Sequence, residues 1–311
     1  MSQTYPKVTI VGAGNVGATT ALLLLQKEIA NVVMIDVADG IAKGKALDLM
    51  HMRSNEHFGP SVIGTGDYGD TTNSDLIIIT AGVPRKPSMS REDLIDINAA
   101  IMCSVLEEAI PASPDACYII VTNPLDVLTN MAALLVDVPH NRLFGMGGVL
   151  DTARFTYAIA AETGANPAEI KALVIGAHGE AMVPIPSVTT VNGEPLTSVV
   201  DAYALARIIE ATVQGGAEVV RFLETGSAFY APASSILKMV EAILGDTGEV
   251  FSSCVRLQGE YGISGVSLCV PAVLGAEGVR NVEELDLSYS ELLQLHASAE
   301  SIKEQLKRFE Q

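Results

Sequence analysis

Short apolar blocks and longer helical patterns alternate along the first half of the chain. Apolar runs of strand length occupy residues 7–11, 32–35, 76–80 and 118–122. Helical patterns lie between or after them, over residues 15–28, 92–109 and 125–135. Runs such as LIIIT and YIIVT are apolar throughout, which is typical of central parallel strands covered on both faces. This order predicts an α/β fold with a doubly wound parallel sheet.

The pattern changes after about residue 146, where helices predominate. Helical stretches cover residues 149–162, 200–222, 233–244 and 290–309, with β-like runs at residues 173–176 and 266–270. We therefore expect a first domain over residues 1–146 and a second, α+β domain over residues 147–311. A length of 311 residues is sufficient for two domains that each bury a core.

The composition is that of a globular protein, with 49% hydrophobic and 18% charged residues. No apolar run approaches the roughly 20 residues that cross a bilayer, and the N-terminus lacks the features of a signal peptide. The four cysteines form no CxxC pair, so we expect reduced thiols in a cytoplasm and no metal site. A formal net charge of -18 argues against nucleic acid as a partner.

The segment KVTIVGAGNVG places Gly12, Gly14 and Gly17 between the first strand and the first helix. Glycines there let the backbone approach a pyrophosphate, which rests on the helix N-terminus. Asp36 closes the second strand about 20 residues later, where a carboxylate accepts hydrogen bonds from the adenosine ribose and repels a 2′-phosphate. The sequence thus predicts a Rossmann domain that binds NAD in preference to NADP. The alternative is a structural turn beside a solvated aspartate.

Three further motifs carry candidate chemistry. GAHGE presents His178, whose imidazole suits proton transfer near neutral pH, although a single histidine is often structural. LDTAR places Asp151 and Arg154 on one face of a helix, where the alternative is an exposed ion pair. TNPLD puts Asn123 at the carboxyl end of a central strand, where doubly wound folds bind ligands, or where it caps a turn.

The segment VPRKPSMSR gathers Arg85, Lys86 and Arg91 in a chain with 37 acidic and 19 basic residues. Pro84 and Pro87 disfavour a helix, so the cations lie on a loop. Positive charge concentrated on a loop of an acidic protein indicates an anionic ligand.

Together these motifs resemble the lactate/malate dehydrogenase family. GAGNVG, the aspartate after the second strand, AGVPRKPSMSRED, TNPLD, LDTAR and GAHGE occur in the order of that family, and the match extends to GSAFYAPA and VPAVLGAEGV near the end. The sequence is most similar to the malate dehydrogenases that resemble lactate dehydrogenases. The resemblance implies hydride exchange between NAD and a small 2-hydroxy or 2-oxo acid.

The resemblance also implies a role for each candidate residue. His178 is the proton donor and acceptor, and Asp151 orients it. Arg154 binds the C1 carboxylate, Asn123 hydrogen-bonds the substrate oxygen, and Arg91 polarises the reacting carbonyl. The implied cofactor-binding residues are Gly12, Gly14, Asn15, Val16, Gly17, Asp36, Asn98, Val121 and Asn123.

By the same resemblance, Arg85 occupies the position that decides the substrate. Lactate dehydrogenases have a glutamine there, whereas an arginine pairs with the second carboxylate of malate or oxaloacetate. The resemblance also implies that the loop over residues 82–93 is a mobile lid that closes over the substrate. Without that carboxylate, closure of the lid would bury an unpaired guanidinium. We therefore expect an NAD-dependent malate dehydrogenase of the tricarboxylic acid cycle. Its partners are then a small dicarboxylate and other copies of the chain, with a tetramer favoured and a dimer the alternative.

Three alternatives stay open. The first is the same chemistry on lactate or another 2-hydroxy acid. The second is an NAD-binding protein without turnover, acting as a sensor or structural component. The third is a metal-dependent NAD-using glycosidase, which shares the fold but needs a site of cysteine and histidine. No cysteine lies near a histidine in this sequence.

Overall fold

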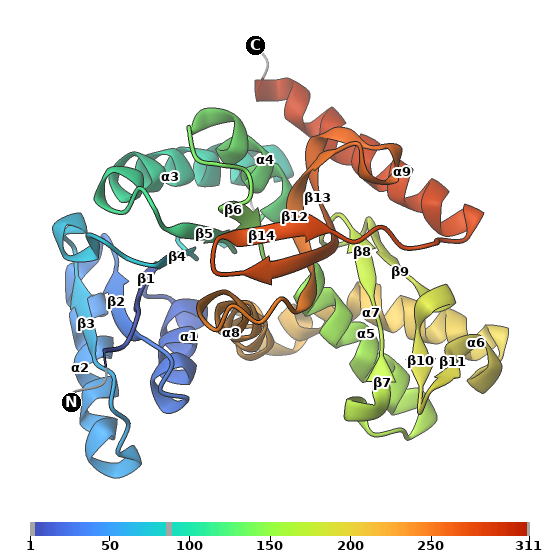
Figure 1. Ribbon diagram of the computed structural model, residues 1–311, viewed down its shortest axis with the longest axis horizontal. Coiled ribbons are helices and arrows are strands. Elements are labelled where there is room, and N and C mark those ends of the chain that lie inside the picture. Colours follow the sequence, from blue (N-terminus) through green and yellow to red (C-terminus); the bar gives the residue numbers. More distant parts are fainter. Residues whose placement is uncertain (1–3, 85–88, 310–311) are drawn as a thin grey trace.

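The computed structural model describes residues 4–84 and 89–309, and Figure 1 shows their course. The strands of the first half are β1 (Lys7–Val11), β2 (Asn31–Ile35), β3 (Val62–Thr65), β4 (Leu76–Ile79), β5 (Cys117–Ile120) and β6 (Leu143–Gly145). The helices of this half are α1 (Asn15–Gln26), α2 (Asp39–Glu56), α3 (Arg91–Ala112) and α4 (Leu125–Leu135). The alternation of strands and helices follows the sequence prediction, with α2, β3 and β6 as additional elements that the sequence did not predict.

The second half mixes helices with short strands. Its helices are α5 (Gly148–Thr163), α6 (Leu196–Val199), α7 (Ala202–Leu223), α8 (Tyr230–Leu244) and α9 (Tyr289–Leu306). Its strands are β7 (Ile170–Lys171), β8 (Val174–Gly176), β9 (Met182–Pro184), β10 (Thr190–Val191), β11 (Glu194–Pro195), β12 (Val250–Gln258), β13 (Ser264–Gly275) and β14 (Gly278–Val282). None of the helices described is long and apolar enough to cross a membrane.

One mixed sheet runs through both halves of the chain. Its strand order is β3-β2-β1-β4-β5-β6-β12-β13-β8-β9, with β14 paired to β13. Adjacent strands are parallel from β3 to β6 and antiparallel from β12 onward. The two halves join where Gly145 of β6 pairs with Cys254 of β12. The parallel, doubly wound part of the sheet confirms the predicted α/β fold.

The central strands are buried on both faces, as their apolar runs predict. Leu76 and Ile78 of β4 pack into the cluster that includes α1 and α8, whereas Ile77 and Ile79 pack into the cluster with α3 and α4. In Figure 1 these helix pairs lie below and above the sheet. Burial of each such side chain contributes roughly 1.5–3 kcal/mol to the free energy of folding. Both layers therefore hold the carboxyl ends of the parallel strands in fixed positions.

Some elements differ from the sequence expectation. The first helix ends at Gln26 rather than residue 28, because Glu28 adopts a positive φ of 54°. The last helix ends at Leu306 and continues as a 3₁₀ turn over Lys307–Phe309. The sequence did not predict α2, which has only two buried residues and therefore a weak apolar face.

Candidate active site

Two glycines give the loop after β1 its shape. Gly12 has a φ of +104°, and a Cβ there would lie 2.7 Å from the Ala81 nitrogen. A Cβ on Gly17 would lie 2.0 Å from the Gly12 carbonyl oxygen. No other residue fits these two positions without a backbone shift, since both contacts are shorter than any real Cβ contact.

The third glycine leaves the start of α1 open. Gly14 is the N-cap residue, and no atom outside its chain neighbours lies within 4 Å of a Cβ added there. Gly14 and Asn15 are exposed, whereas Val16 is half-buried. The first N–H groups of a helix have no partner within the helix, and they carry its positive dipole end. This open helix end fits a pyrophosphate group.

Asp36 and Lys45 hold the peptide group between these glycines. Asp36 accepts hydrogen bonds from the Ala13 nitrogen at 2.8 Å through Oδ2 and from the Ala38 nitrogen at 2.9 Å through Oδ1. Lys45 Nζ donates to the Ala13 carbonyl oxygen at 2.7 Å. The Asp36 carboxylate is thereby oriented and keeps acceptor capacity for a ribose. These residues fit the phosphate and ribose groups of NAD.

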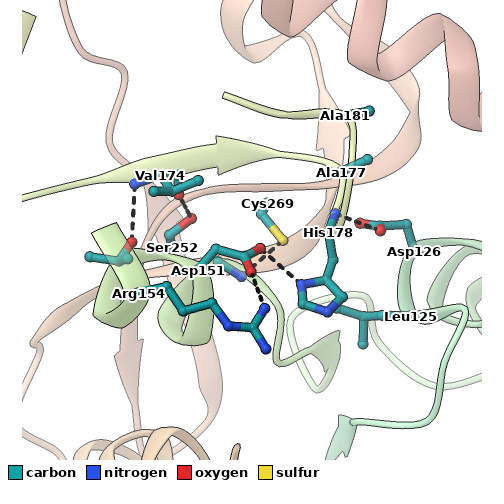
Figure 2. Close-up of polar contacts among 12 residues, drawn as sticks. Leu125, Asp126, Asp151, Arg154, Val174, Ala177, His178, Ala181, Ser252 and Cys269 are labelled. Atoms are coloured by element: carbon teal, nitrogen blue, oxygen red, sulfur yellow. Dashed lines mark hydrogen bonds and ion pairs between the residues drawn. The ribbon is translucent and has the colours of Figure 1, made fainter. Parts of the chain in front are cut away.

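A buried carboxylate connects the two main candidates for chemistry (Figure 2). Asp151 of α5 is 1% exposed, and its Oδ2 lies 2.9 Å from Nδ1 of His178, which follows β8. Its Oδ1 accepts a hydrogen bond from Arg154 Nη1 at 3.3 Å. Since a carboxylate only accepts hydrogen bonds, the proton of a neutral His178 is assigned to Nδ1. Its Nε2 is then the atom that can accept a proton from a substrate.

The charges around His178 favour its protonated form. Burial by itself lowers the pKa of His178, but the charge and hydrogen bond of Asp151 and the charge of Asp126 together raise it above its ordinary value. Arg154 opposes this rise by charge repulsion. An imidazole in this setting can take up and return a proton near neutral pH.

Arg154 packs against two glycines inside α7, a contact that the sequence analysis did not predict. A Cβ on Gly216 would lie 3.3 Å from both Nη1 and Nη2 of Arg154. A Cβ on Gly215 would lie 3.5 Å from Arg154 Cδ. Glycine inside a helix costs roughly 1 kcal/mol relative to alanine, so a pair in α7 is a signal that could have pointed to such a contact.

Matches to known proteins extend over the whole of this arrangement. Residues 6–145 match the lactate/malate dehydrogenase NAD binding domain, and residues 148–311 match the lactate/malate dehydrogenase alpha/beta C-terminal domain. The chain belongs to the lactate/malate dehydrogenase family. It therefore carries the NAD-binding domain of a family of oxidoreductases.

Malate dehydrogenases and lactate dehydrogenases both match nearly the full length of the chain. The chain is 47% identical over 304 residues to the malate dehydrogenase of Nostoc sp., which covers 98% of this chain and 94% of that protein. The malate dehydrogenase structure from Salinibacter ruber shares 42% identity, with a TM-score of 0.93 and coverages of 98% and 97%. A lactate dehydrogenase from Cryptosporidium parvum, complexed with lactic acid and nicotinamide adenine dinucleotide, shares 37% identity with a TM-score of 0.94, and covers 99% of each chain. The family fold is thus common to enzymes with different substrates.

Three other expected cofactor residues lie in α3 and on the loop after β5. The buried Asn98 donates to the carbonyl oxygens of Val83 at 3.1 Å and Asn123 at 2.7 Å, and accepts from the Val83 nitrogen at 2.8 Å. Asn98 thus ties the loops after β4 and β5 together. Asn123 is exposed, and its Oδ1 accepts from the Leu125 nitrogen at 3.3 Å, while Val121 beside it is half-buried.

The cations that the sequence gathers after β4 are described only in part. Arg85 and Lys86 lie outside the described residues. Arg91 is the first residue of α3, which Ser90 and Asp93 begin with a capping box. The side chain of Arg91 also lies outside the description.

The fold gathers three buried groups beside His178 that were not predicted from the sequence. Asp126 lies in the TNPLD motif, and Cys254 and Cys269 face each other across β12 and β13. A carboxylate oxygen and the two sulfur atoms lie within 4.8 Å of one another. No cysteine lies near a histidine along the chain, but a Cβ on Gly147 would contact both Cys269 and His178. Sequence separation therefore concealed this neighbourhood.

Proposed function

We propose that the protein is an NAD-dependent malate dehydrogenase that interconverts malate and oxaloacetate. The observation that carries the proposal is the buried Asp151, which binds a histidine through one oxygen and an arginine through the other. This geometry supports proton transfer and carboxylate binding at neighbouring points. It is the pair of functions that oxidation of a 2-hydroxy acid needs.

His178 takes the hydroxyl proton of malate on Nε2 and returns it in the reverse direction. Asp151 holds the ring through Nδ1 and stabilises the imidazolium that forms. Arg154 pairs with the C1 carboxylate through guanidinium nitrogens that Asp151 leaves available. When NAD is bound, its nicotinamide accepts the hydride from C2.

The loops supply the remaining roles in this proposal. Asn123 hydrogen-bonds the substrate oxygen, and Arg91 stabilises the charge that develops on it once water is excluded. Arg85 pairs with the second carboxylate. The nine positions from Gly12 to Asn123 that the resemblance assigns to the cofactor bind NAD.

The choice of malate over lactate rests on Arg85 and on the similarity to malate dehydrogenases. We expect kcat/KM to be higher for oxaloacetate than for pyruvate, and higher with NADH than with NADPH. Replacing Arg85 by glutamine should shift the preference toward pyruvate, by on the order of 10⁴-fold in the ratio of kcat/KM values at most.

A wild-type preference for pyruvate would make the protein a lactate dehydrogenase. Binding of NADH without oxidation by any 2-oxo acid would instead favour a protein without turnover. Unchanged relative rates in Arg85→Gln would show that this position does not read the second carboxylate.

The proposal extends to the setting of the enzyme. We place its reaction in the tricarboxylic acid cycle and its two domains on either side of a boundary at residues 146 and 147. The four cysteines are free, which supports a reducing cytoplasm. We propose a homo-oligomer, with a tetramer favoured over a dimer, and sedimentation of the purified protein measures it.

A further inference from the structure

Asp126 approaches His178 from the side opposite Asp151 (Figure 2). It lies in the first turn of α4, three residues after Asn123, and is 4% exposed. Its Oδ2 accepts a hydrogen bond from the backbone nitrogen of His178 at 2.8 Å. A second carboxyl group is therefore buried against the proposed proton carrier.

A purely structural role does not account for a carboxyl group at this position. An asparagine oxygen would accept the same backbone N–H without the cost of burying a charge. Burial raises the pKa of Asp126 to about 6, against the opposing effect of the His178 charge and N–H. Asp126 is thus ionised above about pH 6, and its charge is what distinguishes it from an amide.

We propose that Asp126 is a positioning residue, which holds the backbone of His178 and supplies a second negative charge that keeps the imidazolium form available near neutral pH. This inference rests on the proposed function, because it assigns the proton step to His178. Asp126 also connects the two halves of the site, since Pro124 alone separates α4 from the proposed substrate residue Asn123.

The other titratable and charged groups that face Asp126 and His178 do not replace the charge of Asp126. They are Asp151 and Arg154 from α5, Cys254 from β12 and Cys269 from β13. Burial raises the pKa of the Cys254 thiol well above its ordinary value. A hydrogen bond with Cys254 lowers the pKa of Cys269, but burial together with the charges of Asp126 and Asp151 leaves that pKa raised as well. Both thiols therefore stay neutral while His178 titrates.

The role predicts a specific change in pH dependence. Reduction of oxaloacetate needs protonated His178, so its kcat/KM falls as the pH rises through the pKa of that residue. Loss of a nearby negative charge moves this alkaline limit to lower pH, by about one unit for a group in contact. At pH values above the wild-type limit, kcat/KM for oxaloacetate should then be about ten-fold lower than in the wild type, and at pH values below the shifted limit it should change little.

The test compares Asp126→Asn with Asp126→Glu and with the control Glu291→Gln. Glu291 is another buried carboxylate, 6% exposed, at the start of α9. We expect the alkaline limit of oxaloacetate reduction to move down in Asp126→Asn, to be at least partly restored in Asp126→Glu, and to stay in place in Glu291→Gln. A uniform loss of activity at every pH in Asp126→Asn, with an unmoved limit, overturns the proposal.

Histidine titration by NMR gives a readout that needs no turnover. The resonance of His178 is the one missing from His178→Asn, and its pKa should fall by about one unit in Asp126→Asn. If Asp126→Asn does not fold, the wild-type resonance decides, because it should show a second inflection near pH 6 from Asp126. A single inflection there overturns the inference. Failure of the wild type to reduce oxaloacetate, with the NMR shift present, would refute the proposed function alone.

Discussion

Replacing Gly216 by alanine should weaken substrate binding while leaving the fold as stable or more stable. The added methyl lies 3.3 Å from both terminal nitrogens of Arg154, which is tighter than ordinary contact. The guanidinium must then move by a few tenths of an ångström, away from the position in which it pairs with the C1 carboxylate. Alanine in the interior of α7 favours the helix by about 0.5–1 kcal/mol over glycine, so stability and binding change in opposite directions.

The size of the effect follows from the bonds at risk. A hydrogen bond to a charged group contributes about 1.5–3 kcal/mol, and a bidentate pair that loses one of its two bonds loses roughly that amount. We expect kcat/KM for oxaloacetate to fall about 10- to 100-fold, mainly through KM, because the carboxylate is bound in both the ground and transition states.

The control is Gly215→Ala, on the same helix one residue earlier. Its methyl lies 3.5 Å from Arg154 Cδ, an ordinary van der Waals contact. For both variants, the melting temperature reports the stability, and the steady-state constants for oxaloacetate with NADH report substrate binding. The reasoning fails if the KM of Gly216→Ala is unchanged, or if Gly215→Ala raises KM by the same factor.

Two further predictions concern the cofactor loop and the C-terminal helix. Lys45→Met should weaken NADH binding about ten-fold, because a charge-assisted hydrogen bond to the Ala13 carbonyl is lost. The control Lys43→Met breaks only an exposed pair with Asp39 and should leave the affinity unchanged. Equal affinities of the two variants for NADH in a fluorescence titration would contradict this prediction. Burial alone would raise the pKa of Glu291, but hydrogen bonds from the Ser288 and Ser187 segments outweigh it and lower that pKa. The stabilisation is therefore present above the unfolded value of 4.5 and lost as the pH falls through the lower folded value. Glu291→Gln should lose about 1–2 kcal/mol of unfolding free energy at pH 7 and show a weaker acid dependence in urea titrations, and an unchanged pH 7 stability would refute it.

Local sequence patterns were enough for the α/β architecture and for the glycine loop. Burial of β4 and β5 on both faces follows from runs of apolar residues within a few positions, and the conformation at Gly12 follows from its missing side chain. The spacing of Asp151 and Arg154, three residues apart in a helical pattern, likewise predicts that both lie on one face. The weakly amphipathic α2 was missed, because its buried residues are the two alanines Ala42 and Ala46, which give its sequence a weak apolar face.

The sequence by itself determined which chemical groups are available and which of them share a strand end or a helix face. Only the tertiary structure decided that Asp151 reaches His178, that Asp126 lies on the other side of the same residue, and that α7 places a glycine against Arg154. These relationships join segments that are far apart along the chain. Pairing of β6 with β12, of β12 with β13 and of β13 with β8, together with packing of α5 on α7, brings them together. Burial and neighbouring charges set the protonation of such groups, and neither exists until the chain has folded.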